Sequence, residues 1–172
     1  MGSNLPTAVV NGEDHCLAGT AIRTTIANQT KVVLDDLDFN VYGTPDANLT
    51  EELAKVFFSE PVDRAFFTER LCIVSDSVMG LIMEMGTELR TRIAIDSRSK
   101  TVKDGALWQE EALPVETLLA ASVYASASYS NTVSLTAEQV LAHLRSIVTA
   151  HSSIQFGGNA SVGQGFCLIH LR

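Results

Sequence analysis

The sequence predicts an α+β fold in a single domain, residues 1–172, and three observations support that class. Segments with the two-residue period of strands are interleaved with segments that carry helix-capping signals. A chain of 172 residues has the length of one domain, and 46% apolar residues are enough to build a core. Aromatic residues make up only 6%, so aliphatic side chains must form most of that core.

The N-terminal third predicts a strand followed by a helix. Residues 1–30 are weakly patterned and predict a loop with one strand around Ala18–Ile26. LDFNVY at 37–42 alternates apolar and polar residues, which is typical of a half-buried strand. The turn signal GTPDAN follows it, and NLTEELAKVFF then predicts a helix whose N-cap is Thr50.

The middle third predicts a strand, a helix and a long β-hairpin. RLCIVSD at 70–76 reads as a short buried strand. The next segment predicts a helix that begins at Ser75 or Asp76 and ends near Gly86. Its apolar face is expected to hold Val78, Ile82, Met85 and Leu89. In residues 91–114, apolar residues alternate with polar ones, polar turn residues follow, and apolar residues then return. This pattern predicts a hairpin with a charged tip.

The C-terminal third predicts a strand, a helix and a closing strand. TLLAASVYASASYS, which starts at Thr117, has the composition of a small-residue strand. LTAEQVLAHLRSIVTAH predicts a helix over 136–151, since Thr136 and Gln139 have the spacing of a capping box. A glycine-rich segment follows, and GFCLIHL at 165–171 predicts the closing strand.

Charge and cysteine content limit the classes of partner and compartment. The net charge of −8 argues against a nucleic-acid partner for the surface as a whole. Basic residues nevertheless gather within 86–103, so a local basic strip is expected there: Arg90, Arg92, Arg98, Lys100 and Lys103. No apolar run approaches a membrane span, and the N-terminus lacks the pattern of a secretory signal. Three widely spaced cysteines indicate free thiols in a reducing compartment, and we expect a cytoplasmic protein.

The segment SIQFGGNASVGQGF contains a cluster of glycines just ahead of the closing strand. Gly157, Gly158, Gly163 and Gly165 fall within nine residues. The spacing matches neither dinucleotide-binding nor P-loop patterns, because no lysine follows and the segment leads into a strand. Two interpretations remain: a tight connection that needs unusual backbone angles, or bare main chain against which a phosphate chain lies.

Candidates for metal binding or catalysis are weak, and no catalytic residue is assigned. His143 and His151 are eight positions apart, which is not the spacing of a zinc pair on one helix. The acidic run at 35–38 could hold a divalent cation, but a solvated strand edge is the simpler interpretation. Glu110 and Glu111 are adjacent, so in a strand they point to opposite faces and cannot act as a pair. We therefore predict no metal site and no cofactor in this chain.

Four segments, taken in order, resemble the RAMP superfamily of CRISPR effector proteins. VVLDDLDFNV is similar to an entering strand, and IVSDSVMGLIMEMGTEL to the helix that follows. TRIAIDSRSKTVKDGALWQEEALP is similar to the middle segment of the backbone subunit of the type III-B (Cmr) complex, its fourth subunit. SIQFGGNASVGQGF resembles the glycine-rich loop near the C-terminus of these proteins. The resemblance covers about residues 30–172.

This resemblance implies a fold and a set of RNA contacts. The implied fold is a ferredoxin-like (RRM-type) core, incomplete at its N-terminal side, in which helix 136–151 packs on the sheet and 165–171 closes it. Residues 91–113 would form an inserted thumb hairpin that wedges into the guide–target duplex. The expected wedge residues are Ile93, Ile95 and Trp108, with Leu107 beside them. The expected RNA-binding residues are Gly157, Gly158, Asn159, Ser161, Gly163, Gly165, Arg92, Lys100 and Lys103.

The resemblance also implies partners and an activity for longer relatives. Copies of the subunit stack along a guide RNA with other Cmr subunits, pair with target RNA and, with Mg or Mn, cleave it. Family members are considerably longer, and the N-terminal part that carries their catalytic aspartate has no match here. Two alternatives stay open. One is a metal-dependent endoribonuclease active as this chain, using Asp35, Asp36 or Asp96; the other is a protein-interaction module without any RNA role.

Overall fold

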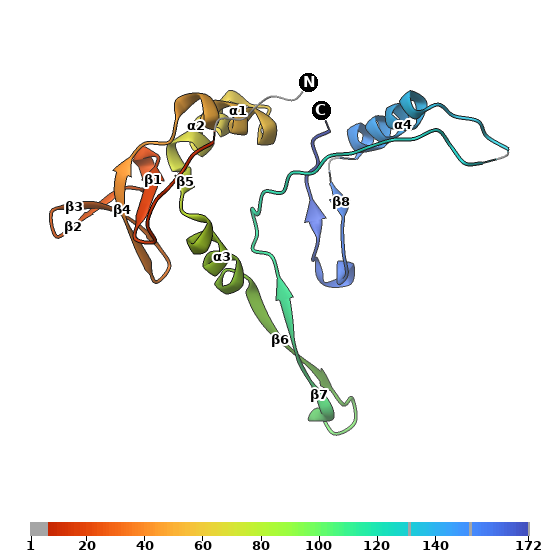
Figure 1. Cartoon of the computed structure of the whole chain (residues 1–172). Coiled ribbons are helices and arrows are strands. Elements are labelled where there is room, and N and C mark those ends of the chain that lie inside the picture. The colour runs from red at the N-terminus through yellow and green to blue at the C-terminus, as the bar shows by residue number, and fades with distance from the viewer. Residues whose placement is uncertain (1–6, 131, 152, 172) are drawn as a thin grey trace. The chain divides into compact units, whose positions relative to one another are not determined.

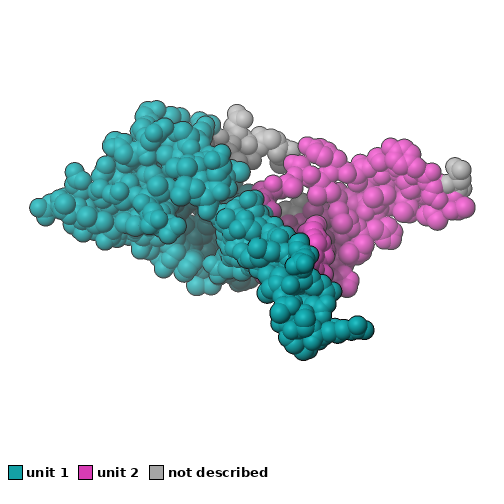
Figure 2. Space-filling view, turned by 90° about the horizontal axis from the view of Figure 1, so that it is seen from below, with its two compact units in different colours: residues 1–118 teal, residues 119–172 magenta. Residues whose placement is uncertain are grey.

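A computed structural model describes residues 7–130, 132–151 and 153–171 (Figure 1). The chain divides into two compact units, residues 1–118 and 119–172, which Figure 2 colours teal and magenta. The first six residues of the weakly patterned N-terminal segment lie outside the described ranges. The prediction of one domain over the whole chain stays a prediction.

Unit 1 is built on a five-stranded mixed sheet with the order β2-β3-β4-β1-β5. Strands β1 and β4 run parallel, and all other neighbouring pairs run antiparallel. The predicted strand at 37–42 is therefore confirmed. The strand expected around Ala18–Ile26 is instead split by a short 3₁₀ turn, η1 (Thr20–Ile22). The strands are β1 (His15–Ala18), β2 (Thr24–Ile26), β3 (Gln29–Leu34), β4 (Leu37–Gly43) and β5 (Cys72–Ile73).

The core of unit 1 lies on one face of this sheet. Val32 of β3 and Phe39 of β4 are register partners, and only 1% and 3% of their surfaces are exposed. Cys16 and Ala18 of β1 are fully buried beside them. Val78 from the following helix packs on the same cluster. Burying each large apolar side chain contributes roughly 1.5–3 kcal/mol, which makes this cluster the principal stabilising feature of the unit.

Two helices, α1 (Ala47–Phe57) and α2 (Pro61–Arg70), follow the sheet strand β4. The expectation that Thr50 caps the first helix is wrong. Asp46 is the N-cap, because its carboxylate accepts a hydrogen bond from the Leu49 amide at 2.9 Å. Thr50 is buried inside the first turn and donates its hydroxyl to the Asp46 carbonyl oxygen at 2.7 Å. Helix α2 was not predicted, although Pro61 is well suited to a first helical position.

Helix α3 (Asp76–Met85) confirms the predicted boundaries. The Ser75 hydroxyl accepts from the Val78 amide, and Gly86 ends the helix with its amide bonded to the Ile82 carbonyl oxygen at 2.7 Å. The strand expected at 70–76 shrinks to the two residues of β5, since helix α2 reaches Arg70 and α3 starts at Asp76. The expected apolar face is also shorter than predicted, because Leu89 already belongs to the next strand and Met85 is exposed.

The predicted β-hairpin is confirmed. It consists of β6 (Glu88–Ile95) and β7 (Val102–Ala112), which pair antiparallel from Glu88↔Ala112 to Ile93↔Leu107. Beyond that point the register shifts, and Ile95 pairs with Val102 near the tip. The extra residues of β7 therefore form an irregular section close to the turn.

Unit 2 contains helix α4 (Ala137–Ala150) and a short β-hairpin. The predicted capping box is confirmed: Thr136 accepts from the Gln139 amide, and the Gln139 side chain accepts from the Thr136 amide. The strand predicted from Thr117 to Ser130 is wrong, because these residues form neither helix nor strand. The closing strand is shorter than 165–171, since only two residue pairs join β8 (Ile154–Gln155) to β9 (Phe166–Cys167).

Both units together establish the α+β class, with a mixed sheet in unit 1 and β-hairpins in each unit. The cysteines are free, as predicted: Cys16 is buried, Cys72 is half-buried and Cys167 is exposed. Within the ranges that the structure describes, no helix has the length and apolar character needed to cross a bilayer.

Candidate nucleic-acid interface

The glycine-rich segment forms the connection between β8 and β9 in unit 2 (Figure 1). It carries the predicted loop residues on one continuous stretch of chain, and this stretch includes the 3₁₀ turn η2 (Ala160–Val162). Residues 156–163 are all exposed. The main chain of this loop is therefore open to a ligand rather than enclosed by the unit's own side chains.

Three of the four glycines are explained by the loop's own backbone. Gly157 and Gly163 have φ angles of 76° and 79°, which L side chains rarely adopt. Gly165 has a φ of 74°, and a Cβ atom there would lie 1.9 Å from the Phe156 carbonyl oxygen. That close approach accompanies a hydrogen bond from the Phe156 amide to the Gly165 carbonyl oxygen at 2.8 Å. These three positions fit the interpretation of a tight connection.

Gly158 is different, because neither backbone angle nor space requires a glycine there. Its φ lies outside the left-handed region, and a Cβ atom would meet no described atom within 4 Å. A side chain at this position would simply project from the loop. The bare main chain at Gly158 is therefore what the second interpretation needs, a site where a ligand comes close to the backbone.

The β6–β7 hairpin presents two chemically different faces. Cross-strand partners share a face, so Ile93 and Leu107 lie together, and strand alternation places Ile95 on the same side. Arg92 and Trp108 are partners on the opposite face. The predicted wedge residues are thus divided, because Ile93 and Ile95 lie on the apolar face and Trp108 on the charged one.

Glu110 organises the charged face of the hairpin. Its carboxylate lies 3.1 Å from the Arg92 Nε atom and accepts a hydrogen bond from the Trp108 Nε1 atom at 2.9 Å. The hydrogen bond from Trp108, assisted by Arg92, lowers the pKa of Glu110 below its ordinary value. Arg90 on the same face pairs with Glu88 at 2.5 Å. The arginine charges of this face are therefore compensated by neighbouring carboxylates.

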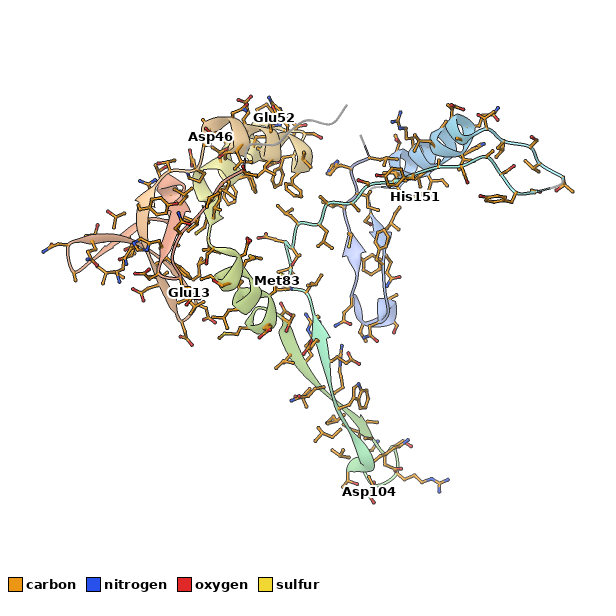
Figure 3. The ribbon with its side chains drawn as sticks, viewed as in Figure 1. Glu13, Asp46, Glu52, Met83, Asp104 and His151 are labelled. Carbon is orange, nitrogen blue, oxygen red and sulfur yellow. The ribbon has the colours of Figure 1, made fainter. Side chains whose placement is uncertain are left out.

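The tip of the hairpin carries cations without such compensation. Among the described residues, no ion pair involves Lys100 or Lys103, and both are exposed. Asp96 shapes the turn, since its carboxylate accepts from the Arg98 and Ser99 amides at 2.8 and 3.0 Å. These two hydrogen bonds lower the pKa of Asp96, and the bond from the Ser99 amide is the larger cause. Figure 3 labels Asp104, which belongs to the same end of the hairpin.

The acidic residues of the sequence do not assemble into a metal site in the described part of the chain, where no cluster of three or more potential ligands occurs. Asp35 has a φ of 52° and lies in the turn between β3 and β4. Asp38 pairs with Lys31 across those strands. Asp96 is committed to the hairpin turn. Each carboxylate therefore has a local structural setting of its own.

The structure gathers the predicted RNA-binding residues into two groups. The glycines, Asn159 and Ser161 form one group on the β8–β9 loop, and Arg92, Lys100 and Lys103 form the other on the β6–β7 hairpin. Sequence reasoning missed Gln155, whose side chain holds the loop from within. Its only sequence signal was its position two residues before the first glycine of the loop, Gly157.

Comparison with known proteins supports the sequence resemblance. The RAMP superfamily profile matches residues 11–168. The CRISPR system Cmr endoribonuclease Cmr4 of Pyrococcus furiosus is 27% identical over 164 residues, which cover 91% of this chain and 52% of that protein. The crystal structure of oligomeric Cmr4 from Pyrococcus furiosus matches with a TM-score of 0.48 and 17% identity, covering 96% of this chain and 54% of that one.

The chain thus spans about half the length of the curated relative it matches. The superfamily match, by contrast, extends over nearly all of the described residues and includes both the hairpin and the glycine loop. The predicted resemblance, including its similarity to Cmr4, is confirmed, and the chain belongs to the RAMP superfamily.

Proposed function

We propose that the chain is a guide-RNA-binding backbone subunit of a type III-B CRISPR (Cmr) effector in the cytoplasm. In this proposal several copies stack along one guide RNA, together with other Cmr subunits, and the guide pairs with target RNA. The similarity to Cmr4 supports the assignment to this type of complex. The finer fold belongs to the same proposal: a ferredoxin-like core in which helix α4 and strand β9 take part.

The single observation that carries the RNA assignment is the open main chain at Gly158. A phosphate group can approach backbone N–H groups closely only where no side chain intervenes. Gly158 provides such a place, since a Cβ atom there would meet nothing and no backbone strain demands a glycine. The β8–β9 pairing holds the two sides of the loop together.

The hairpin supplies the second set of contacts. Lys100 and Lys103 attract phosphates as charges, whereas Arg92 is already paired with Glu110 and is expected to contribute little to phosphate binding. In the proposed wedge, the exposed side chains of Ile93 and Ile95 insert into the guide–target duplex from the apolar face. Trp108 lies on the other face with 46% of its residue surface exposed, and in the proposal its ring stacks on a base.

Cleavage of target RNA belongs to the longer relatives in this proposal. The similar protein of Pyrococcus furiosus is named an endoribonuclease. Mg or Mn is the expected cofactor of cleavage in such longer relatives. The described carboxylates of this chain do not fit such an ion, because they are spread over separate turns and ion pairs. We therefore assign no catalytic residue here. Loss of cleavage in an Asp35→Ala, Asp36→Ala or Asp96→Ala variant that still binds RNA would favour the alternative enzyme.

Filter binding of a guide-like single-stranded RNA tests the proposal. Gly158→Asp places a carboxylate where the phosphate is expected, and we predict a loss of affinity of about tenfold or more. Gly80→Asp is the matched control, because Gly80 lies on helix α3 with nothing within 4 Å of its Cβ position. It adds the same charge to the protein, and its affinity should stay within about twofold of wild type.

Two outcomes would contradict the proposal. Equal binding by wild type and Gly158→Asp would remove the glycine loop from the RNA site. Absence of binding by the wild-type chain, or binding that does not weaken as salt increases, would favour the protein-interaction module, since phosphate contacts release counterions.

A further inference from the structure

The side chain of Gln155 lies inside the glycine loop and gathers its carbonyl groups. The Gln155 Nε2 atom is 3.1 Å from the carbonyl oxygen of Phe156, 3.0 Å from that of Gly157 and 3.3 Å from that of Gly158. On the other side of the loop it approaches the Gln164 carbonyl oxygen at 3.5 Å. Because all these groups only accept hydrogen bonds, it is the donating end of the Gln155 amide that must face them.

This arrangement fixes the direction of the loop's N–H groups. All described peptide bonds are trans, so the C=O and N–H of one peptide unit point in opposite directions. The carbonyls of Phe156 and Gly157 point inward to Gln155. The amides of Gly157 and Gly158, which belong to the same two peptide units, must therefore point outward. Neither amide has a hydrogen-bond partner among the described residues.

Two adjacent exposed N–H groups that point the same way are suited to an anion. We propose that Gln155 is a positioning residue, which turns the loop carbonyls inward so that the Gly157 and Gly158 amides can bind an RNA phosphate. This inference rests on the proposed function. It adds the group that orients the main chain and names the two donors that meet the phosphate.

The side chain of Gln155 is suited to orienting the loop carbonyl groups. A long side chain with an N–H₂ group reaches several carbonyl oxygens at once and carries no charge. Methionine has a similar length and the same charge but donates no hydrogen bond. A Gln155→Met variant would leave the inward carbonyls unpaired, and the two peptide units would be free to rotate. The loss of RNA affinity would then reflect orientation rather than a missing protein–RNA contact.

The experiment measures RNA affinity as a function of salt for wild type, Gln155→Met and the control Gln29→Met. Gln29 is exposed at the start of β3, far in sequence from the loop. We expect Gln155→Met to lower the affinity about tenfold, because the Gly157 and Gly158 N–H groups would no longer be held in the direction that suits a charged phosphate acceptor. The slope of log affinity against log salt should stay unchanged, since no cation has been removed. Gln29→Met should behave as wild type.

Hydrogen exchange of the Phe156 amide separates positioning from simple support of the hairpin. This amide donates to the Gly165 carbonyl oxygen at 2.8 Å and reports whether β8 and β9 still pair. We expect its protection to persist in Gln155→Met. Loss of that protection together with loss of binding would overturn the inference, because Gln155 would then only hold the hairpin together.

The remaining outcomes distinguish this inference from the proposed function. If wild type binds RNA and Gln155→Met binds equally well, the inference fails and the proposed function stands. If wild type does not bind RNA at all, the proposed function fails first. A lower affinity accompanied by a smaller salt slope would also contradict the inference, since it would indicate that Gln155 acts through the basic residues.

Discussion

Under the proposed function, the glycine loop and the β6–β7 hairpin would offer RNA two different kinds of contact. The loop between β8 and β9 exposes main chain, and its open position is Gly158, where no side chain occupies the space. The hairpin exposes side chains: the lysines at its tip form no ion pair with any described residue, and the arginines on its charged face are paired. One region would bind phosphate through oriented N–H groups, the other through charge.

This difference teaches how an acidic protein can hold a polyanion. The net charge of −8 opposes long-range attraction, so binding must come from short-range contacts and a local basic strip. Main-chain donors do not depend on net charge, and their strength changes little with salt. In the proposed function, the lysines at the hairpin tip would supply the salt-dependent part. The two regions can therefore be separated by experiment.

The largest effect is expected when both regions are changed together. A variant that combines Gly158→Asp with Lys100→Ala and Lys103→Ala should bind single-stranded RNA about a hundredfold more weakly than wild type. Each region alone is expected to account for about tenfold, and effects of independent sites multiply. Filter binding at one fixed salt concentration measures this. A combined loss no greater than that of one region would show that the two do not contact the same RNA.

The next effect concerns the hairpin lysines alone. Lys100→Ala with Lys103→Ala should lower affinity about tenfold at low salt and reduce the salt slope by about 1.4, since each phosphate contact on a single strand contributes roughly 0.7. Binding isotherms at several salt concentrations give this slope. A neutral loop variant, Gly158→Leu, blocks the main chain without adding charge and should leave the slope unchanged, so equal slopes for it and the lysine variant would remove the proposed distinction between the regions.

A smaller effect is expected from the turn that presents Lys100. Asp96→Ala removes the acceptor of the Arg98 and Ser99 amides, and RNA affinity should fall about threefold as the tip loosens. Asp96→Asn keeps an acceptor oxygen and serves as the control. Amide NMR of Arg98 and Ser99 would show the loosening. A change of RNA cleavage instead of tip mobility would favour the alternative enzyme.

The same turn predicts a pH dependence with a definite sign. The Ser99 and Arg98 amides stabilise the ionised carboxylate and lower the pKa of Asp96 below its ordinary 3.8. Their contribution is therefore present above about pH 4 and is lost as the pH falls through the lowered pKa. Amide shifts of Arg98 and Ser99 should stay constant from neutral pH to about pH 5. A tip that opens within that range would contradict this assignment.

The smallest effect is expected for Arg92. Because Glu110 already pairs with its guanidinium, Arg92→Ala should change RNA affinity less than twofold and leave the salt slope within error of wild type. The same binding isotherms provide the measurement. A slope reduced as much as by a lysine variant would show that Arg92 exchanges Glu110 for a phosphate in the complex.

Local signals in the sequence predicted those elements whose cause is itself local. Thr136 with Gln139 and Ser75 with Gly86 marked two helices correctly, because caps depend on neighbouring backbone groups. Thr50 misled the prediction of α1, since Asp46 is also a good cap and precedes it. The segment from Thr117 to Ser130 has a strand-like composition, but a strand needs a hydrogen-bonded partner, which composition cannot reveal.

The candidate site was predictable in its residues but not in its arrangement. The glycine cluster pointed to the loop, yet only coordinates separate Gly158 from Gly165, whose Cβ would meet the Phe156 carbonyl oxygen. The period of two placed Ile93 and Ile95 on one face. The position of Trp108 on the other face depends on the register of β6 with β7, which a single strand does not encode.

Amide NMR of the uniformly ¹⁵N-labelled chain with guide-like RNA tests the central claim most directly. The claim is that the main chain at Gly157 and Gly158 meets the RNA phosphate. We predict that these two amide signals shift in a saturable way as RNA is added, whereas Gly19 and Gly86, in unit 1, do not. Signals of Gly157 and Gly158 that stay unchanged while the RNA is fully bound would contradict the account.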